Sequence, residues 1–193
     1  GKGPGPGSPK PRAGQIHPEL EPWLDGTQFD GASSLPLLIA ITAFVVGDRQ
    51  VQGHFAEYSP PAPITAEGYG EQIDRLLQRF PWEIQLAQLN GINNHDTARL
   101  LTVAGGDLSS LALATLLLLT FPGAPCIYYG DEIALAGDYD PDCRRAFPPA
   151  AAWNHNILDL HRRLIALRRA HPALRVGQYQ PLMARGSVYG LAR

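Results

Sequence analysis

The chain alternates short apolar segments with longer stretches of helical periodicity, and acidic residues follow the apolar segments closely. The expected strands are residues 27–31, 84–92 and 125–129, and the expected helices are residues 35–46, 67–80, 108–121 and 156–170. Asp96 comes after the second expected strand, and Asp131 comes after the third. Strands and helices in alternation are typical of parallel βα units, whose functional side chains gather at the carboxyl ends of the strands. The sequence therefore predicts an α/β fold with parallel strands.

The longest apolar segment, residues 111–121, is expected to belong to a buried helix. Asp107 stands before it as an N-cap residue, and Pro122 and Gly123 stop it. A helix needs about 20 apolar residues to cross a membrane, and this segment is shorter. The first residues of the chain also lack the apolar core of a signal peptide. No membrane partner and a cytoplasmic location are therefore expected.

The composition is that of a globular protein without a strongly charged partner. Its 193 residues suffice for one domain with a core, and 45% of them are hydrophobic. The formal net charge of −2 gives no reason to expect nucleic acid as a partner. The arginine pairs Arg162-Arg163 and Arg168-Arg169 are expected on the solvated face of a helix.

The cysteine content argues against a disulfide framework and against a metal site. The chain has two cysteines, Cys126 and Cys143, without metal-ligand spacing. Cys126 lies within an expected strand, where a buried thiol is the ordinary outcome. No acidic cluster has the ligand density that calcium needs, so no metal and no other cofactor is expected.

Three polar blocks follow one another in a specific order. They are Asn94-His95-Asp96, Pro122-Gly123-Ala124-Pro125-Cys126-Ile127-Tyr128-Tyr129-Gly130-Asp131-Glu132 and Asp140-Pro141-Asp142-Cys143-Arg144. The first block alone is a weak signal, but the three together are specific. In this order they resemble the C-terminal part of an α-amylase family glycoside hydrolase. The most similar branch contains the neopullulanases, cyclomaltodextrinases and maltogenic amylases.

The resemblance implies about strands five to eight of a (β/α)8 TIM barrel, followed by the start of a C-terminal β domain. Residues 1–13 form a Gly/Pro-rich segment that is expected to be disordered. Residues 14–175 would be the C-terminal half of the barrel. Residues 176–193 would begin a β-sandwich, with short strands at 179–182 and 188–192. A complete barrel takes about 250 residues, and no counterpart of the first four strands is seen.

The resemblance also assigns roles to the catalytic positions. Retaining glycosidases use a nucleophile and a general acid whose carboxyl groups lie about 5 Å apart. The family's nucleophile follows strand four, so no residue of this chain matches it. The acid position is Gln15, whose amide does not protonate a leaving group. Asp96 matches the carboxylate that stabilises the transition state, and His95 matches a histidine that binds the same sugar.

Further residues match the part of the family site that holds the neighbouring glucose. Asp140 and Arg144 resemble a pair that grips vicinal hydroxyl groups, to which fixed charges hydrogen-bond strongly. The alternative is a surface i,i+4 ion pair, which contributes little to stability. Tyr129 is a candidate for stacking on a sugar face, or else a core residue. Arg99 either orders Asp96 and its neighbours or lies at the surface.

The leading hypothesis is a piece of a glycoside hydrolase that acts on α-glucosidic bonds of maltooligosaccharides, cyclodextrins or pullulan. Its partner would be an α-glucan oligosaccharide, and the chain alone would be inactive for want of the nucleophile and the acid. The first alternative is a non-catalytic α-glucan-binding module. The second is an assembly module, because a half barrel leaves two strand edges open to self-association. A decayed gene product without function is the last alternative.

Overall fold

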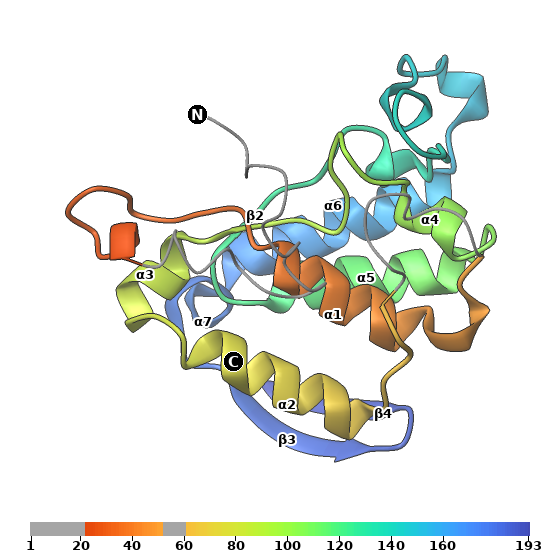
Figure 1. Ribbon diagram of the computed structural model, residues 1–193. Coiled ribbons are helices and arrows are strands. Elements are labelled where there is room, and N and C mark those ends of the chain that lie inside the picture. Colours follow the sequence, from red (N-terminus) through yellow and green to blue (C-terminus); the bar gives the residue numbers. More distant parts are fainter. Residues whose placement is uncertain (1–21, 52–60) are drawn as a thin grey trace, which may run out of the picture.

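The computed structural model describes residues 22–51 and 61–193 as a helical body with short strands and a C-terminal hairpin (Figure 1). The elements in chain order are α1 (Leu35–Val45), η2 (Gly47–Arg49), α2 (Ala66–Leu77), α3 (Trp82–Ala87), β1 (Leu89–Asn90), α4 (Leu100–Val103), α5 (Leu108–Thr120), β2 (Ala124–Pro125), η3 (Asp131–Ile133), η4 (Asp142–Arg144), η5 (Ala150–Ala152), α6 (His155–Ala170), α7 (Pro172–Val176), β3 (Gln180–Arg185) and β4 (Val188–Ala192). Gln15 and the Gly/Pro-rich segment expected over residues 1–13 lie outside the described residues.

Short parallel strands lie side by side beside α1. β1 pairs with β2 in parallel, with Leu89 opposite Ala124. On its other side, Leu89 forms a parallel bridge with Ser33, where the backbone N–H of Ser34 donates to the carbonyl of Leu89 at 2.8 Å. The three paired segments follow the order of the chain, with helices between them, as in consecutive βα units. The predicted parallel α/β arrangement is confirmed.

The strands are shorter than the sequence predicts. Residues 27–31 form bends and irregular structure rather than a strand, and the bridge to Leu89 is made at Ser33. The first part of the strand expected over residues 84–92 instead belongs to the helix α3, which ends at Ala87 and leaves only Leu89–Asn90 as a strand. The helix begins after Pro81, with the N–H of Gln85 donating to the carbonyl of Pro81 at 2.9 Å. A proline readily precedes a helix, because the first turn needs no backbone donor there.

The strand expected over residues 125–129 is also corrected, since β2 ends at Pro125. Proline offers no N–H to a strand ladder, so pairing weakens at this position. Cys126, expected to be buried in that strand, is exposed, whereas Cys143 is buried. The buried-thiol interpretation of Cys126 is therefore wrong.

Gly123 allows β2 to approach β1 closely. Its φ of +109° is unusual for other residues, and a Cβ there would collide with the side-chain amide of Asn90 and the carbonyl of Gln88. The Asn90 amide donates to the carbonyl of Pro122 at 2.8 Å, which fixes the same junction from the side chain. Pro122 and Gly123, expected only to stop a helix, therefore also set the contact between the two strands.

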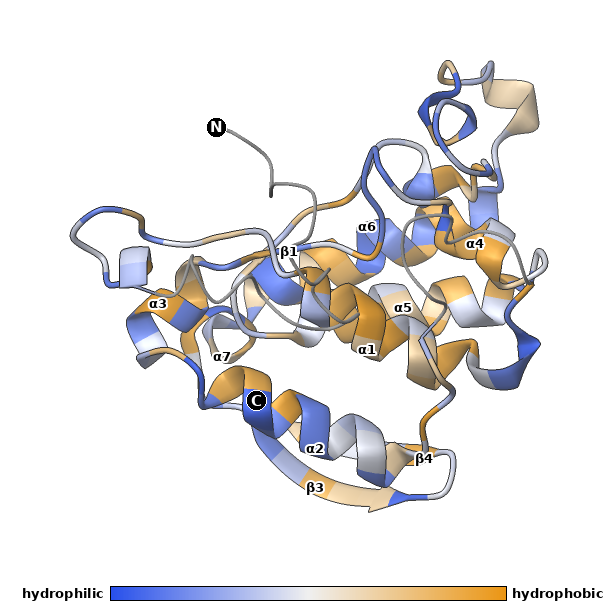
Figure 2. Ribbon diagram, viewed as in Figure 1, coloured by the Kyte–Doolittle hydropathy of each residue, from blue (hydrophilic) through white to orange (hydrophobic). Residues whose placement is uncertain are grey.

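The core of the molecule surrounds α1, which Figure 2 shows as an almost continuously apolar helix in contact with α2 and α5. Nine of its 11 residues are buried. The largest buried apolar side chains of this core are Leu37, Ile41, Tyr69, Ile73, Leu100, Leu111, Leu118 and Phe121. The predicted burial of the helix over residues 111–121 is confirmed along one face of α5. Within the described residues, no helix is long and apolar enough to cross a membrane.

The N-cap predicted at Asp107 is confirmed. Its carboxylate accepts hydrogen bonds from the Ser109 N–H at 3.0 Å and the Ser110 hydroxyl at 2.8 Å, and it lies 2.6 Å from a guanidinium nitrogen of Arg49. The Ser110 hydroxyl, followed by the Ser109 amide, holds the pKa of Asp107 below its usual value. The carboxylate thus satisfies a free donor at the start of the buried helix.

We expect Asp107→Ala to lower the free energy of unfolding by about 1 kcal/mol, because the first turn of α5 loses its acceptor. Asp107→Asn keeps an acceptor oxygen at the same place and should cost only about a few tenths of a kcal/mol. Urea denaturation of the three proteins measures both differences. An asparagine variant as unstable as the alanine variant would contradict the capping explanation.

The two short strands expected near the end of the chain are confirmed as the antiparallel hairpin β3–β4, which packs against α2 (Figure 1). The ring of Tyr69 lies 4.9 Å from that of Tyr189 and 4.9 Å from that of Phe44. At the turn, the N–H of Gly186 donates to the Glu67 carboxylate at 3.0 Å. The hairpin is therefore fixed to α2 at its aromatic side and at its turn, and its assignment to a separate β-sandwich stays a prediction.

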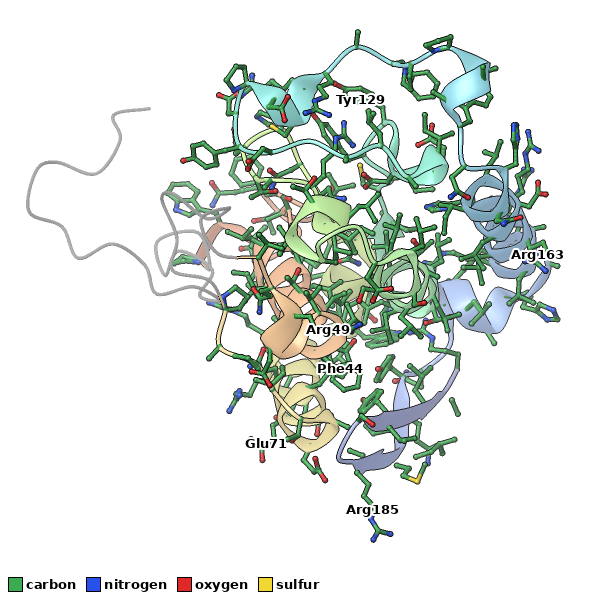
Figure 3. The ribbon with its side chains drawn as sticks, turned by 90° about the vertical axis from the view of Figure 1, so that its right-hand side faces the viewer. Phe44, Arg49, Glu71, Tyr129, Arg163 and Arg185 are labelled. Carbon is green, nitrogen blue, oxygen red and sulfur yellow. The ribbon has the colours of Figure 1, made fainter. Side chains whose placement is uncertain are left out.

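The arginine pairs of α6 lie in different environments. Arg162 and Arg163 are exposed as predicted, and Figure 3 shows Arg163 at the outer edge of the molecule. Arg168 is buried instead, on the same face of α6 as the buried residues Ile157 and His161. Its solvated placement is a wrong prediction, because helical spacing from Ile157 turns this residue toward α5 rather than toward water.

Candidate functional site

The Asn-His-Asp block forms a tight turn that follows β1. The N–H of Asp96 donates to the side-chain oxygen of Asn94 at 2.8 Å, a local bond that asparagine favours in turns. One residue earlier, the buried side chain of Asn93 accepts a hydrogen bond through its oxygen from the N–H of Leu100 at 2.6 Å, at the start of α4. This turn is therefore anchored on both sides, and it presents His95 and Asp96 outward with 64% of each side chain exposed.

Arg144 joins the two polar blocks. Its Nε donates to the carbonyl of His95 at 2.9 Å and lies 2.9 Å from the Asp140 carboxylate. Its Nη2 lies 3.6 Å from the Asp96 carboxylate, and His95 Nε2 lies 3.3 Å from the same oxygen. The structure thus brings four of the predicted site residues together, although 44 residues of chain separate Asp96 from Asp140.

The four side chains form an accessible cluster of acceptors and donors. The Asp140 and Arg144 side chains are 45% and 46% exposed, so water surrounds much of the ion pair. Such a pair contributes little to stability, which fits the predicted i,i+4 alternative as well as a binding role. Two carboxylates beside one guanidinium leave unused lone pairs and N–H groups on the open side, which suit a ligand with several hydroxyl groups.

Tyr129 lies on the segment after β2 and contacts Arg145, the residue next to Arg144. Its hydroxyl donates to the carbonyl of Arg145 at 2.7 Å, and the residue is 38% exposed. The Arg99 guanidinium lies 4.9 Å from the ring centroid, and the ring of Tyr128 lies 4.8 Å away at a steep angle. Tyr129 is therefore held by its hydroxyl and by Arg99, with part of its ring open to solvent.

Arg99 and Asp131 form a buried ion pair beneath the exposed cluster. Arg99 Nη1 lies 3.0 Å from the Asp131 carboxylate, and the two side chains are 0% and 2% exposed. Burial raises the pKa of Asp131 to about 7, since desolvation outweighs the favourable charge of Arg99. The surface alternative for Arg99 is wrong.

The sequence signal for this buried pair is present but weak. Arg99 stands directly before the apolar residues Leu100 and Leu101, both of which are buried in α4. An arginine at such a boundary is usually read as a solvated residue, because arginine is almost never fully buried without a partner. The partner, Asp131, lies 32 residues further along the chain, so only the tertiary structure identifies it.

In the described part of the chain, no three His, Cys, Asp or Glu side chains lie where they would hold a metal ion. Gln15, which the family resemblance predicts at the acid position, lies outside the described residues. The candidate site therefore consists of the four exposed residues His95, Asp96, Asp140 and Arg144 and of the buried ion pair beneath them.

Comparison with known proteins shows the family of the chain. Residues 19–156 match the model of the α-amylase catalytic domain. The chain belongs to the α-amylase family. Its parallel strands and the helices between them are accordingly part of a (β/α)8 barrel, and the predicted fold class is confirmed.

Members of this family with solved structures match most of the chain. The debranching enzyme from Nostoc punctiforme is 54% identical with a TM-score of 0.81, over 89% of this chain and 36% of that one. The cyclic α-maltosyl-(1→6)-maltose hydrolase from Arthrobacter globiformis, solved with that sugar, is 33% identical with a TM-score of 0.73, over 83% and 34%. Among curated relatives, a cyclomaltodextrinase from Thermoanaerobacter pseudethanolicus is 34% identical over 95% of this chain and 30% of its own length.

The chain thus spans 30–36% of the length of these three relatives. Other α-amylase family relatives are a maltogenic α-amylase from Bacillus acidopullulyticus and neopullulanase 2 from Thermoactinomyces vulgaris. The resemblance to the neopullulanase, cyclomaltodextrinase and maltogenic amylase branch is confirmed.

Proposed function

We propose that this chain is part of a retaining glycoside hydrolase that acts on α-glucosidic bonds of maltooligosaccharides, cyclodextrins or pullulan. The observation that carries the proposal is the gathering of His95, Asp96, Asp140 and Arg144 around one guanidinium on an exposed surface. The names of the family relatives, which include cyclomaltodextrinase, maltogenic α-amylase and neopullulanase, support the substrate class.

In this proposal the cluster binds adjacent glucose units. The Asp96 carboxylate accepts hydrogen bonds from sugar hydroxyls, and these bonds strengthen as positive charge develops on the ring in the transition state. His95 binds the same sugar. Asp140 and Arg144 take the neighbouring unit, because a carboxylate and a guanidinium offer fixed acceptors and donors for vicinal hydroxyls. The exposed part of the Tyr129 ring adds an apolar surface for a sugar face.

The same proposal makes the chain by itself a binder rather than a catalyst. Asp96 stabilises charge and neither attacks nor protonates the substrate, and Gln15 stands at the position of the acid. An amide does not act as a general acid in glycoside cleavage. The chain alone should therefore bind maltooligosaccharides without hydrolysing them.

We expect Asp96→Asn to weaken the binding of maltotriose about tenfold, because a hydrogen bond to a charged acceptor becomes a neutral one. Calorimetric titration of the full chain measures the dissociation constant. Asp159→Asn is a matched control, since Asp159 is an equally exposed carboxylate (63% against 64%) and also pairs with an arginine, Arg162, at 3.3 Å. It should leave the dissociation constant unchanged.

Two outcomes of these measurements decide between the proposed function and its alternatives. No binding at millimolar maltotriose would reject the sugar-binding cluster and leave assembly as the alternative to pursue. Hydrolysis of maltotriose, cyclodextrin or pullulan that Asp96→Asn abolishes would overturn the expected inactivity of the chain. Binding without hydrolysis fits both a piece of an enzyme and a non-catalytic binding module, and the relatives' names favour the enzyme.

A further inference from the structure

We propose that Arg99, assisted by Thr102, is a positioning residue that holds the loop carrying Asp140 and Arg144 against the His95-Asp96 turn. The inference rests on the proposed sugar-binding function of that cluster. Arg99 is completely buried, so its side chain does not touch a sugar and acts only through the groups that it holds.

The side chain of Arg99 binds two separate segments at once, residues 129–131 and Cys143. Its Nη1 donates to the carbonyl of Tyr129 at 2.9 Å and to the Asp131 carboxylate at 3.0 Å. Its Nε donates to the carbonyl of Cys143 at 3.1 Å. The guanidinium also lies 4.5 Å from the ring centroid of Tyr128. One buried cation therefore fixes the segment after β2, the start of η3 and the residue next to Arg144.

Arg99, the N-cap residue of α4, and Thr102 within α4 hold the other end of the same loop. The N–H of Arg99 donates to the carbonyl of Gly137 at 2.9 Å, and the N–H of Gly137 donates to the Thr102 hydroxyl at 2.9 Å. Gly137 is packed so closely that an added Cβ would lie 3.2 Å from Cδ of Arg99 and 2.9 Å from the carbonyl of Asp142. The loop from Gly137 to Cys143 is thus tied to residues 99–102 at both ends.

These ties reach the exposed cluster through Cys143. The carbonyl of Cys143 is held by Arg99, while its thiol contacts the carbonyl of His95 at 3.3 Å. The next residue, Arg144, donates to the same His95 carbonyl at 2.9 Å. Displacing Cys143 would therefore move Arg144 away from the turn that presents Asp96.

The planar guanidinium is suited to this role and an ammonium is not. Arginine directs several N–H donors along fixed directions, whereas lysine is a single point donor on a flexible stem. A lysine at position 99 keeps a charge for Asp131 but does not reach Tyr129 and Cys143 together. Arg99→Lys should therefore leave the ion pair and loosen the loop.

Calorimetric titration with maltotriose tests the inference, with Arg168→Lys as the matched control. Arg168 is also a buried arginine that donates to several backbone carbonyls, but it holds α5, β2 and α7 rather than the site loop. We expect Arg99→Lys to raise the dissociation constant about tenfold, and Arg168→Lys to change it less than about twofold, at a temperature where circular dichroism shows both folded. Wild-type affinity in Arg99→Lys, or an equal loss in both variants, would overturn the positioning role.

Limited trypsin digestion gives a readout that does not depend on sugar binding. Arg144 and Arg145 are exposed cleavage sites in the held loop, and Arg185 is an exposed site in the distant hairpin (Figure 3). Arg99→Lys should speed cleavage after Arg144 or Arg145 several-fold relative to cleavage after Arg185. If the wild type binds no maltotriose, the proposed function fails, while this cleavage ratio still shows whether Arg99 holds the loop.

Thr102→Val provides a second variant in case Arg99→Lys does not fold. It removes the hydroxyl that accepts the N–H of Gly137 and leaves the buried ion pair intact. We expect roughly threefold weaker binding of maltotriose and faster cleavage after Arg144, in proportion to the single hydrogen bond that is lost. Unchanged affinity together with an unchanged cleavage ratio would reject the anchoring of this loop by residues 99–102.

Discussion

Replacing Arg168 by methionine is expected to lower the free energy of unfolding by about 3–5 kcal/mol, since buried carbonyl groups lose a charged donor. Arg168 donates to the carbonyls of Leu119 (2.9 Å), Phe121 (3.0 Å), Leu174 (2.7 Å) and Gly123 (2.6 Å). The first two lie at the C-terminus of α5, where a cation also complements the helix dipole. These bonds join the end of α5 to the residue before β2 and to α7, so the α5–β2 junction depends on Arg168.

Urea denaturation followed by circular dichroism measures this loss. Arg163→Met is the matched control, because Arg163 lies on the same helix with its side chain exposed (Figure 3). It should change the free energy of unfolding by less than about 0.5 kcal/mol. Equal effects of the two substitutions would show that the loss reflects helix content in α6 rather than the carbonyls that Arg168 holds.

The second large effect is a dependence of stability on pH that arises from the ionisation of Asp131. Burial raises the pKa of this carboxyl from an ordinary value of 3.8 to about 7 in the folded chain. Between these values the folded state keeps a proton that the unfolded state has released. Its contribution to stability is therefore complete below about pH 4, falls as the pH rises and is lost above about pH 7.

Between pH 4 and pH 7, we expect the free energy of unfolding of the wild type to fall by up to about 1.4 kcal/mol per pH unit relative to that of Asp131→Asn, whose amide does not ionise. Chemical denaturation of both proteins at each pH measures the difference between their free energies of unfolding. The other titrating groups are the same in both proteins, so their contributions cancel in this difference. Asp142→Asn is a useful comparison, because the Arg145 side chain lowers the pKa of that exposed carboxyl instead. A constant difference between wild type and Asp131→Asn over this range would show that the buried carboxyl stays ionised.

The candidate site combines an exposed cluster with a buried frame, and the two parts have different consequences. The exposed ion pairs of Arg144 add little to stability, so substitutions there should act on binding. The buried pair Arg99–Asp131 and the loop contacts around it should act on both stability and geometry. This separation makes paired measurements of affinity and unfolding informative for each variant.

Much of the fold follows from local patterns in the sequence. The apolar segments predict α1 and α5, and the N-cap at Asp107 and the stop at Pro122-Gly123 place the ends of α5 to within a residue or two. The short strands at the end of the chain are likewise predicted, because a glycine turn lies between two apolar runs. Local propensity, capping and turn chemistry act over a few residues, and for that reason the sequence alone determines these elements.

The parallel strands are less well predicted, because their length depends on partners far along the chain. α3 replaces the first part of one expected strand, and β2 ends at Pro125, after which Cys126 is exposed. The site residues stay a prediction. The sequence and its family resemblance propose His95, Asp96, Asp140 and Arg144 as candidates, and the tertiary structure shows that these four side chains lie together.

The burial of two arginines follows from the tertiary structure alone. Arg99 and Arg168 have the sequence context of solvated residues, yet both are buried. Apart from Leu174, which is near Arg168 in the chain, their side-chain partners lie 30–49 residues away. A charge enters a protein interior only where acceptors from several segments meet, and no local pattern records that meeting. The sequence by itself therefore determined the long helices, the terminal hairpin and the family of the chain, whereas packing between distant segments decided the extent of the parallel strands and which charges hold the segments together.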